Sequence, residues 1–199
     1  MSMEIKEVRD SFLGWILANL LGVAALGALI VILPFLTTIP GMVASTLIIG
    51  LPIGLAQWIA IRRLAPISIL WIFTISIGLL LALLILRAVP NSMGELVDDE
   101  SITALTAGFA VMGFTTGLIQ WFLLRLQFTK SLVWLLGSTV GISLGSVLVL
   151  ASDLVNKSGI ISIILVVLVY ATATGLTLEW LRGHYAKSHS RLPMNRSGT

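Results

Sequence analysis

Long apolar stretches, separated by proline-containing or polar breaks, dominate this chain of 199 residues. Each stretch holds about 20 residues, enough for a helix to cross a hydrocarbon layer of roughly 30 Å. Six helices are predicted, over residues 12–33, 42–61, 67–89, 102–124, 132–152 and 159–181. Helices are expected because lipid offers no partners for backbone polar groups. The pattern therefore predicts an all-α integral membrane protein with six transmembrane helices.

The composition agrees with a membrane location for most of the chain. Hydrophobic residues make up 57% of the sequence and charged residues 11%, whereas a soluble domain carries about 25% charged residues. Lipid is therefore expected to be the main solvent. We predict one transmembrane domain over residues 1–183 and a basic, mobile cytoplasmic tail over 184–199. The sequence has no cysteine, which excludes disulfides and thiolate metal sites.

Positive charges are distributed unequally between the two sides of the predicted topology. One side holds the chain ends and the loops after the second and fourth helices, with Lys6, Arg9, Arg62, Arg63, Arg125, Lys130, Arg182, Lys187, Arg191 and Arg196. The other side holds only Arg87 and Lys157, beside the acidic stretch at residues 95–100. Loops rich in Lys and Arg stay in the cytoplasm. Both termini are therefore expected to be cytoplasmic.

An internal repeat runs through the chain. Shifting the sequence by one helical hairpin superposes one motif on its copy: Gly50, Gly54, Gln57, Trp58 and Arg62 on Gly113, Gly117, Gln120, Trp121 and Arg125. The same shift places Trp71 and Gly78 on Trp134 and Gly141. A third, degenerate unit uses Trp15 near one end of the chain and Trp180 near the other. The repeat predicts three two-helix hairpins, at about residues 12–61, 67–124 and 132–181.

Glycines recur on single helix faces, often four residues apart. Such small-xxx-small patterns let helix backbones approach closely in lipid. The expected packing glycines are Gly50, Gly54, Gly78, Gly113, Gly117, Gly137, Gly141, Gly145 and Gly175. Helix packing is the main interpretation, and a glycine-lined substrate path is the alternative.

The tryptophans all fall near the predicted cytoplasmic helix ends. Indoles favour the headgroup level, and a nearby Arg can extend its side chain to lipid phosphates. The expected interfacial anchors are Trp15, Trp58, Arg62, Trp71, Trp121, Arg125, Trp134 and Trp180. A pigment or quinone stacking site is the alternative.

Three polar side chains inside the spans form a candidate polar layer. Gln57 and Gln120 each follow a packing glycine by three residues, so they face protein and are expected to make interhelical hydrogen bonds. Glu179 takes the matching place in the third unit. An ion pair with Arg182, or with Arg62 or Arg125, is its simplest role. A cation or proton site is the alternative, because ionisable groups within membranes are often functional.

Catalytic and cofactor signatures are missing from the sequence. It contains no P-loop, GxSxG, HExxH or GxGxxG motif, and no predicted span contains a histidine. We therefore predict no enzyme activity, no catalytic residue, no metal site and no nucleic-acid partner. No cofactor is predicted, and a bound lipid or pigment stays open.

The segments GLAQWIAIR (54–62) and GLIQWFLLR (117–125), each followed by a Trp and a glycine-rich helix, resemble a known group. They are similar to uncharacterised polytopic membrane proteins of bacteria, frequent in cyanobacteria. The resemblance covers the middle hairpins. It implies a multi-pass protein of the plasma (inner) membrane or of the thylakoid membrane, and it implies no catalytic residue.

Three functional hypotheses follow from the sequence. The first is a non-enzymatic subunit, scaffold or assembly factor of a larger membrane complex, a photosynthetic complex being one candidate. Its partners would be membrane lipid and other membrane protein subunits. The second is a small-solute or ion transporter or channel that uses the layer of Gln57, Gln120 and Glu179. The third is a lipid or pigment binder.

Overall fold

The helices begin and end where the sequence interrupts its apolar runs. The computed structural model describes residues 2–32, 42–88, 102–151 and 159–189. The described elements are α1 (Ser2–Ile32), α2 (Met42–Ile61), the short 3₁₀ helix η2 (Ile69–Phe73), α3 (Thr74–Ala88), α5 (Ile102–Leu124), α6 (Leu132–Ala151) and α8 (Gly159–His189). The described part of the chain contains helices and no strand. The predicted all-helical class is confirmed.

Five helical segments are long and apolar enough to cross a membrane. They are Asp10–Ala28, Ile69–Leu86, Thr106–Leu124, Leu132–Leu150 and Ile161–His184. In α2, the apolar segment found among the described residues is shorter, Ile48–Ile61. The protein therefore has the character of a multi-pass membrane protein. That α2 is a sixth span and that both termini are cytoplasmic stay predictions.

The bounds differ from the sequence-based expectation in three places. The third helix starts as η2, because the Ser68 Oγ accepts a hydrogen bond from the Leu70 N–H (3.2 Å) before the α-helical turns of α3 begin. α1 begins earlier, at Ser2. α8 continues to His189, so the first residues of the expected tail are helical. The acidic stretch at 95–100, Lys157 and the tail from residue 190 lie outside the described residues.

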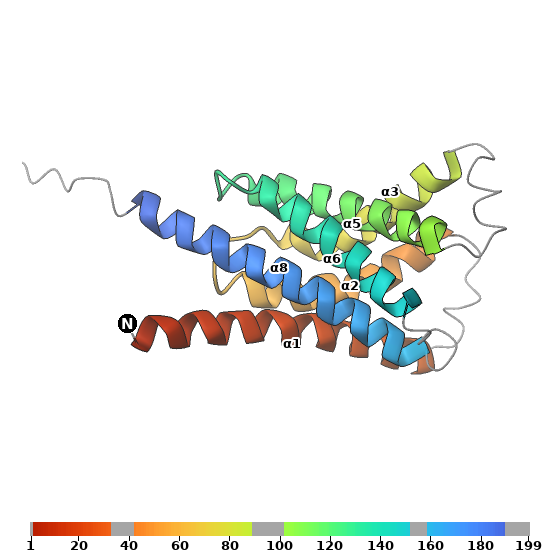
Figure 1. Ribbon diagram of the computed structural model, residues 1–199, viewed down its shortest axis with the longest axis horizontal. Helices are drawn as coiled ribbons and strands as arrows, with labels where there is room; N and C mark the ends of the chain where they lie inside the picture. Colours follow the sequence, from red (N-terminus) through yellow and green to blue (C-terminus); the bar gives the residue numbers. More distant parts are fainter. Residues whose placement is uncertain (1, 33–41, 89–101, 152–158, 190–199) are drawn as a thin grey trace, which may run out of the picture.

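The helices form a closed ring. Each one packs on the helix before it and the helix after it, and α1 also packs on α8. The start of α1 and the end of α8 lie at the same end of the elongated bundle, together with the turns at 62–68 and 125–131 (Figure 1). We call this the terminal end of the bundle.

Glycines mark the contacts around this ring. A Cβ added at Gly22 would lie 2.7 Å from the Cα of Ile53, and one added at Gly117 would lie 2.8 Å from the Cβ of Ser138. The remaining packing glycines face the next helix of the ring at similarly short range: Gly50, Gly54, Gly78, Gly113, Gly137, Gly141, Gly145 and Gly175. Neighbouring helices therefore approach each other more closely than any larger residue would allow.

Candidate functional site

Two glutamines from different helices meet at the centre of the bundle. The Gln120 Nε2 of α5 donates a hydrogen bond to the Gln57 Oε1 of α2 (3.1 Å). Both side chains are fully buried. The same Gln120 Nε2 also donates to the Thr74 Oγ1 at the start of α3 (3.3 Å). The interhelical bond expected of these glutamines is therefore present.

Each glutamine also accepts a hydrogen bond from a tryptophan of the element that follows it. The Trp71 Nε1 of η2 donates to the Gln57 Oε1 (3.3 Å), and the Trp134 Nε1 of α6 donates to the Gln120 Oε1 (2.9 Å). In both cases 14 positions separate the partners. The repeated glutamine thus serves to hold the repeated tryptophan of the next element inside the bundle.

The first and last helices complete this network with different residues. The Asn19 Oδ1 of α1 accepts from the Gln57 Nε2 (2.7 Å), and the Asn19 Nδ2 donates to the Trp15 carbonyl (2.9 Å). The Trp15 Nε1 donates to the Thr174 Oγ1 of α8 (3.0 Å). Thr174 in turn donates to the Tyr170 carbonyl (2.7 Å). A threonine therefore accepts the indole N–H in the third unit, where the other two units use glutamine.

We call this network the amide–indole core and define it as Trp15, Asn19, Gln57, Trp71, Thr74, Gln120, Trp134 and Thr174. All of its side chains are buried. The Trp134 ring lies edge-on to both Trp15 (centroids 5.7 Å apart) and Trp71 (5.8 Å). Apolar residues packed around the three rings include Ile61, Leu124 and Leu181.

The expectation of an interfacial anchor is wrong for Trp15, Trp71 and Trp134. Their exposed fractions are 1%, 0% and 0%. An indole seeks the headgroup level because its N–H needs a polar partner. Here a glutamine or threonine side chain supplies that partner, so the ring can be buried among helices.

The other three tryptophans are partly or largely exposed at the surface of the bundle, which we call its rim. Each of them has a cation beside its ring. The Arg62 guanidinium lies 4.6 Å from the Trp58 ring centroid, and the Arg125 guanidinium lies 5.5 Å from that of Trp121. The sequence has no Arg four residues after Trp180. The ammonium of Lys130, on the turn before α6, lies 5.7 Å from that ring instead. Such contacts contribute about 0.5–1 kcal/mol each at exposed sites.

Glu179, the third residue of the predicted polar layer, pairs with Arg182 of the same helix. Its Oε2 lies 3.9 Å from the Arg182 Nε, which makes the ion pair that the sequence suggested. The Arg182 Nη1 also donates to the Ser11 Oγ of α1 (2.9 Å). The third amide of the central layer is Asn19, contributed by α1.

Tyr170 adds a buried hydroxyl beside the amide–indole core. Its side chain is 8% exposed and its hydroxyl faces Gln57, Gln120 and Ser138. In the described part of the chain, none of its neighbours meets the distance and the angles of a well-formed hydrogen bond to this hydroxyl. It is the polar atom next to the core that an ordered water or small solute would satisfy.

The chemistry of the core is that of a structural clamp. Its amides and indoles bind one another, and none of them presents a nucleophile beside a base. Within the described residues, no three His, Cys, Asp or Glu side chains lie together in a way that could hold a metal ion. The interhelical bonds instead couple the α-helices that the structure describes at one level of the bundle.

The predicted polar layer lacked three members of this core, Asn19, Thr74 and Thr174, of which Asn19 makes two hydrogen bonds. For the two glutamines and their tryptophans a signal was present, because the Gln–Trp spacing of 14 residues occurs twice. No comparable spacing points to Thr174, because its partner lies 159 positions away.

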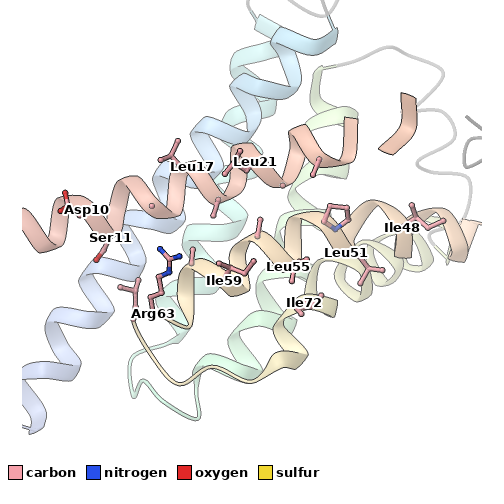
Figure 2. Close-up of a pocket in the computed structure, with 18 residues that line it drawn as sticks. Asp10, Ser11, Leu17, Leu21, Ile48, Leu51, Leu55, Ile59, Arg63 and Ile72 are labelled. Atoms are coloured by element: carbon pink, nitrogen blue, oxygen red, sulfur yellow. The ribbon is translucent and has the colours of Figure 1, made fainter. Parts of the chain in front are cut away.

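A groove runs along the outer side of the bundle between α1 and α2. Its volume is about 1130 Å³. Leu17, Leu21 and Leu55 line its apolar length, while Asp10, Ser11 and Arg63 lie at the terminal end of the bundle (Figure 2). We call this feature the α1–α2 groove.

The chain has no match among the protein-family models, curated proteins or solved structures with which it was compared.

Proposed function

We propose that this chain is a non-enzymatic subunit, scaffold or assembly factor of a larger membrane complex. The amide–indole core is the observation that supports this role best. It joins side chains from the six α-helices of the described residues at one level and leaves its amides and indoles engaged with one another. A bundle fixed in this way presents rigid outer faces, as a structural subunit requires.

The outer faces are suited to contact with lipid or with other membrane helices. Large apolar residues point outward at four-residue intervals along α6, at Leu132, Leu136, Val140, Leu144 and Leu148. The resemblance to cyanobacterial membrane proteins adds a plasma or thylakoid membrane as the proposed location. A photosynthetic assembly is one candidate complex.

The test is purification from the native membrane in mild detergent, followed by mass spectrometry of the intact assembly. A protein partner at fixed stoichiometry is the expected result. A lone, colourless protein would contradict the proposal. A pigment that copurifies and absorbs visible light would favour the pigment-binding alternative instead.

Transport is the second candidate function, and the Tyr170 hydroxyl is the observation that favours it. This buried hydroxyl faces both central glutamines. The full burial of Gln57 and Gln120 argues against a continuous polar path. Replacement of Glu179 by Gln separates the two functions: a scaffold keeps its partner, whereas a transporter that uses this carboxylate loses solute uptake in vesicles.

A further inference from the structure

The α1–α2 groove differs from the rest of the outer surface because a cation lies at one end of it. Arg63 follows α2 by two residues, and Figure 2 shows its side chain turned toward α1, on the side of Asp10 and Ser11. Beyond this polar end, the lining is almost entirely apolar. The groove therefore combines one charged end with a long hydrophobic channel.

The described part of the groove is long enough to hold a headgroup and an acyl chain. Along α1 the lining runs from Asp10 to Ala25, which at 1.5 Å per residue is about 22 Å. Half of a bilayer, headgroups included, measures about 20–22 Å. The cation at one end and the long apolar lining together match the phosphate and the acyl chain of a lipid.

The groove is also wider at its charged end. A Cβ added at Gly14 would have no atom within 4 Å, whereas one added at Gly22 would lie 2.7 Å from the Cα of Ile53. The two helices thus diverge toward Asp10 and Arg63. This shape places a headgroup at the wide end and an acyl chain along the narrowing part.

Arg63 interrupts the internal repeat. Arg62 matches Arg125, but the residue that matches Arg63 is Leu126. Arg62 lies over the Trp58 ring, so its guanidinium is engaged at the rim. The extra arginine belongs to the α1–α2 groove and not to the repeated anchor.

We propose that the α1–α2 groove binds one glycerophospholipid of the surrounding leaflet, with its phosphate at Arg63 and an acyl chain along Leu17, Leu21 and Leu55. An acyl chain gains little free energy by leaving the other chains of the bilayer. The apolar part of the groove therefore selects a lipid by the fit of its shape. The charged end selects by headgroup, since a Lys or Arg near the surface attracts anionic lipid. Asp10 at the same end limits the negative charge that the headgroup can carry.

Native mass spectrometry of the detergent-purified protein tests this inference. The probes are phosphatidylglycerol and a diacylglycerol with the same acyl chains. We expect one phosphatidylglycerol to stay bound and diacylglycerol to be lost. Replacing Arg63 by Gln is expected to weaken phosphatidylglycerol binding about fivefold, and Arg62→Gln serves as the matched control with little effect.

A second pair of variants tests the shape of the groove. Gly14→Phe places a ring in the wide end, with its Cβ more than 4 Å from any atom of another helix, and should remove the bound lipid. Gly27→Phe has equal free space on the same helix but lies outside the groove lining, and should keep the lipid. If Gly14→Phe unfolds, the comparison of Arg63→Gln with Arg62→Gln decides whether the groove binds the lipid.

Three results would overturn the inference: no retained lipid, equal retention of both probes, or unchanged binding in Arg63→Gln. These results concern the lipid alone. A protein partner that copurifies while the groove is empty would support the scaffold role and reject the lipid. Bound lipid without a protein partner would support the lipid site and reject the scaffold role.

Discussion

Gln57 and Gln120 hydrogen-bond to each other across the centre of the bundle, although 63 positions separate them in the chain. They hold the same place in two copies of the repeated motif, and each also accepts a tryptophan N–H. The repeated element therefore builds the interior of the protein by contact with its own copy.

The bond between the two glutamines should be measurable as a coupling free energy. Replacing Gln57 by Leu leaves Trp71, Asn19 and Gln120 each short of a partner, so we expect the free energy of unfolding to fall by roughly 1–3 kcal/mol. A double-mutant cycle with Gln120→Leu should give a coupling of about 0.6–1.7 kcal/mol. Unfolding by denaturing detergent in mixed micelles provides the measurement. A coupling of zero would show that the two amides act independently.

Fluorescence quenching can separate the buried tryptophans from those at the rim. In a variant with Trp58, Trp121 and Trp180 changed to Phe, the emission comes only from the three buried rings. Brominated lipids and aqueous acrylamide should quench this variant much less than the unchanged protein. Similar quenching of both would place Trp15, Trp71 and Trp134 at the lipid interface after all.

The packing role of the glycines predicts a contrast between two substitutions. A side chain at Gly141 would meet Ala173 and Tyr170 of α8, with its Cβ 3.0 Å from the Ala173 Cβ. Gly141→Leu should therefore separate α6 from α8 and lower the thermal midpoint sharply. A Cβ added at Gly108, on α5, would have no atom within 4 Å, so Gly108→Leu should leave the midpoint nearly unchanged. Comparable losses in the two variants would refute the packing interpretation.

The ion pair of Glu179 and Arg182 should contribute little to stability. Its atoms are 3.9 Å apart, at the outer limit of an ion pair, and the Arg182 and Glu179 side chains are 24% and 14% exposed, so we expect a contribution no larger than that of a weak surface pair, about 0–1 kcal/mol. Glu179→Gln is therefore expected to fold normally and to keep any protein partner. A large loss of stability would indicate that the carboxylate has a further structural partner.

The carboxylate at the mouth of the α1–α2 groove should oppose an anionic headgroup. Replacing Asp10 by Asn removes a negative charge near Arg63, so phosphatidylglycerol should bind more tightly. Native mass spectrometry at several lipid concentrations would measure the shift. Weaker binding in this variant would mean that Asp10 positions Arg63 for the phosphate.

The helical spans could be predicted from the sequence because apolar length and helix-ending residues are local features of the chain. The predicted bounds of α2 and α5 agree with the structure, since both helices end at the Trp–Arg motif. The 3₁₀ start of the third span depends on the Ser68 cap and on the burial of Trp71, so apolar length alone could not reveal it.

The environment of the tryptophans was harder to predict. Trp58 and Trp71 look alike in sequence, each near a helix end on the same side of the bundle. What separates them is the partner of the indole N–H: the Ile67 carbonyl at the rim for Trp58 (3.4 Å), and the buried Gln57 amide for Trp71. Such partners come from tertiary packing. The general preference of tryptophan for membrane interfaces says nothing about them.

The closure of the ring by α1 and α8 has a consequence for synthesis of the chain. Trp15 enters the membrane early, but its acceptor Thr174 is made 159 residues later. At about 5–20 residues per second, that interval lasts roughly 8–30 s. During this time the indole of Trp15 must find a temporary partner, such as lipid or an insertion factor. In a nascent chain that stalls before α8, the indole of Trp15 lacks its native acceptor.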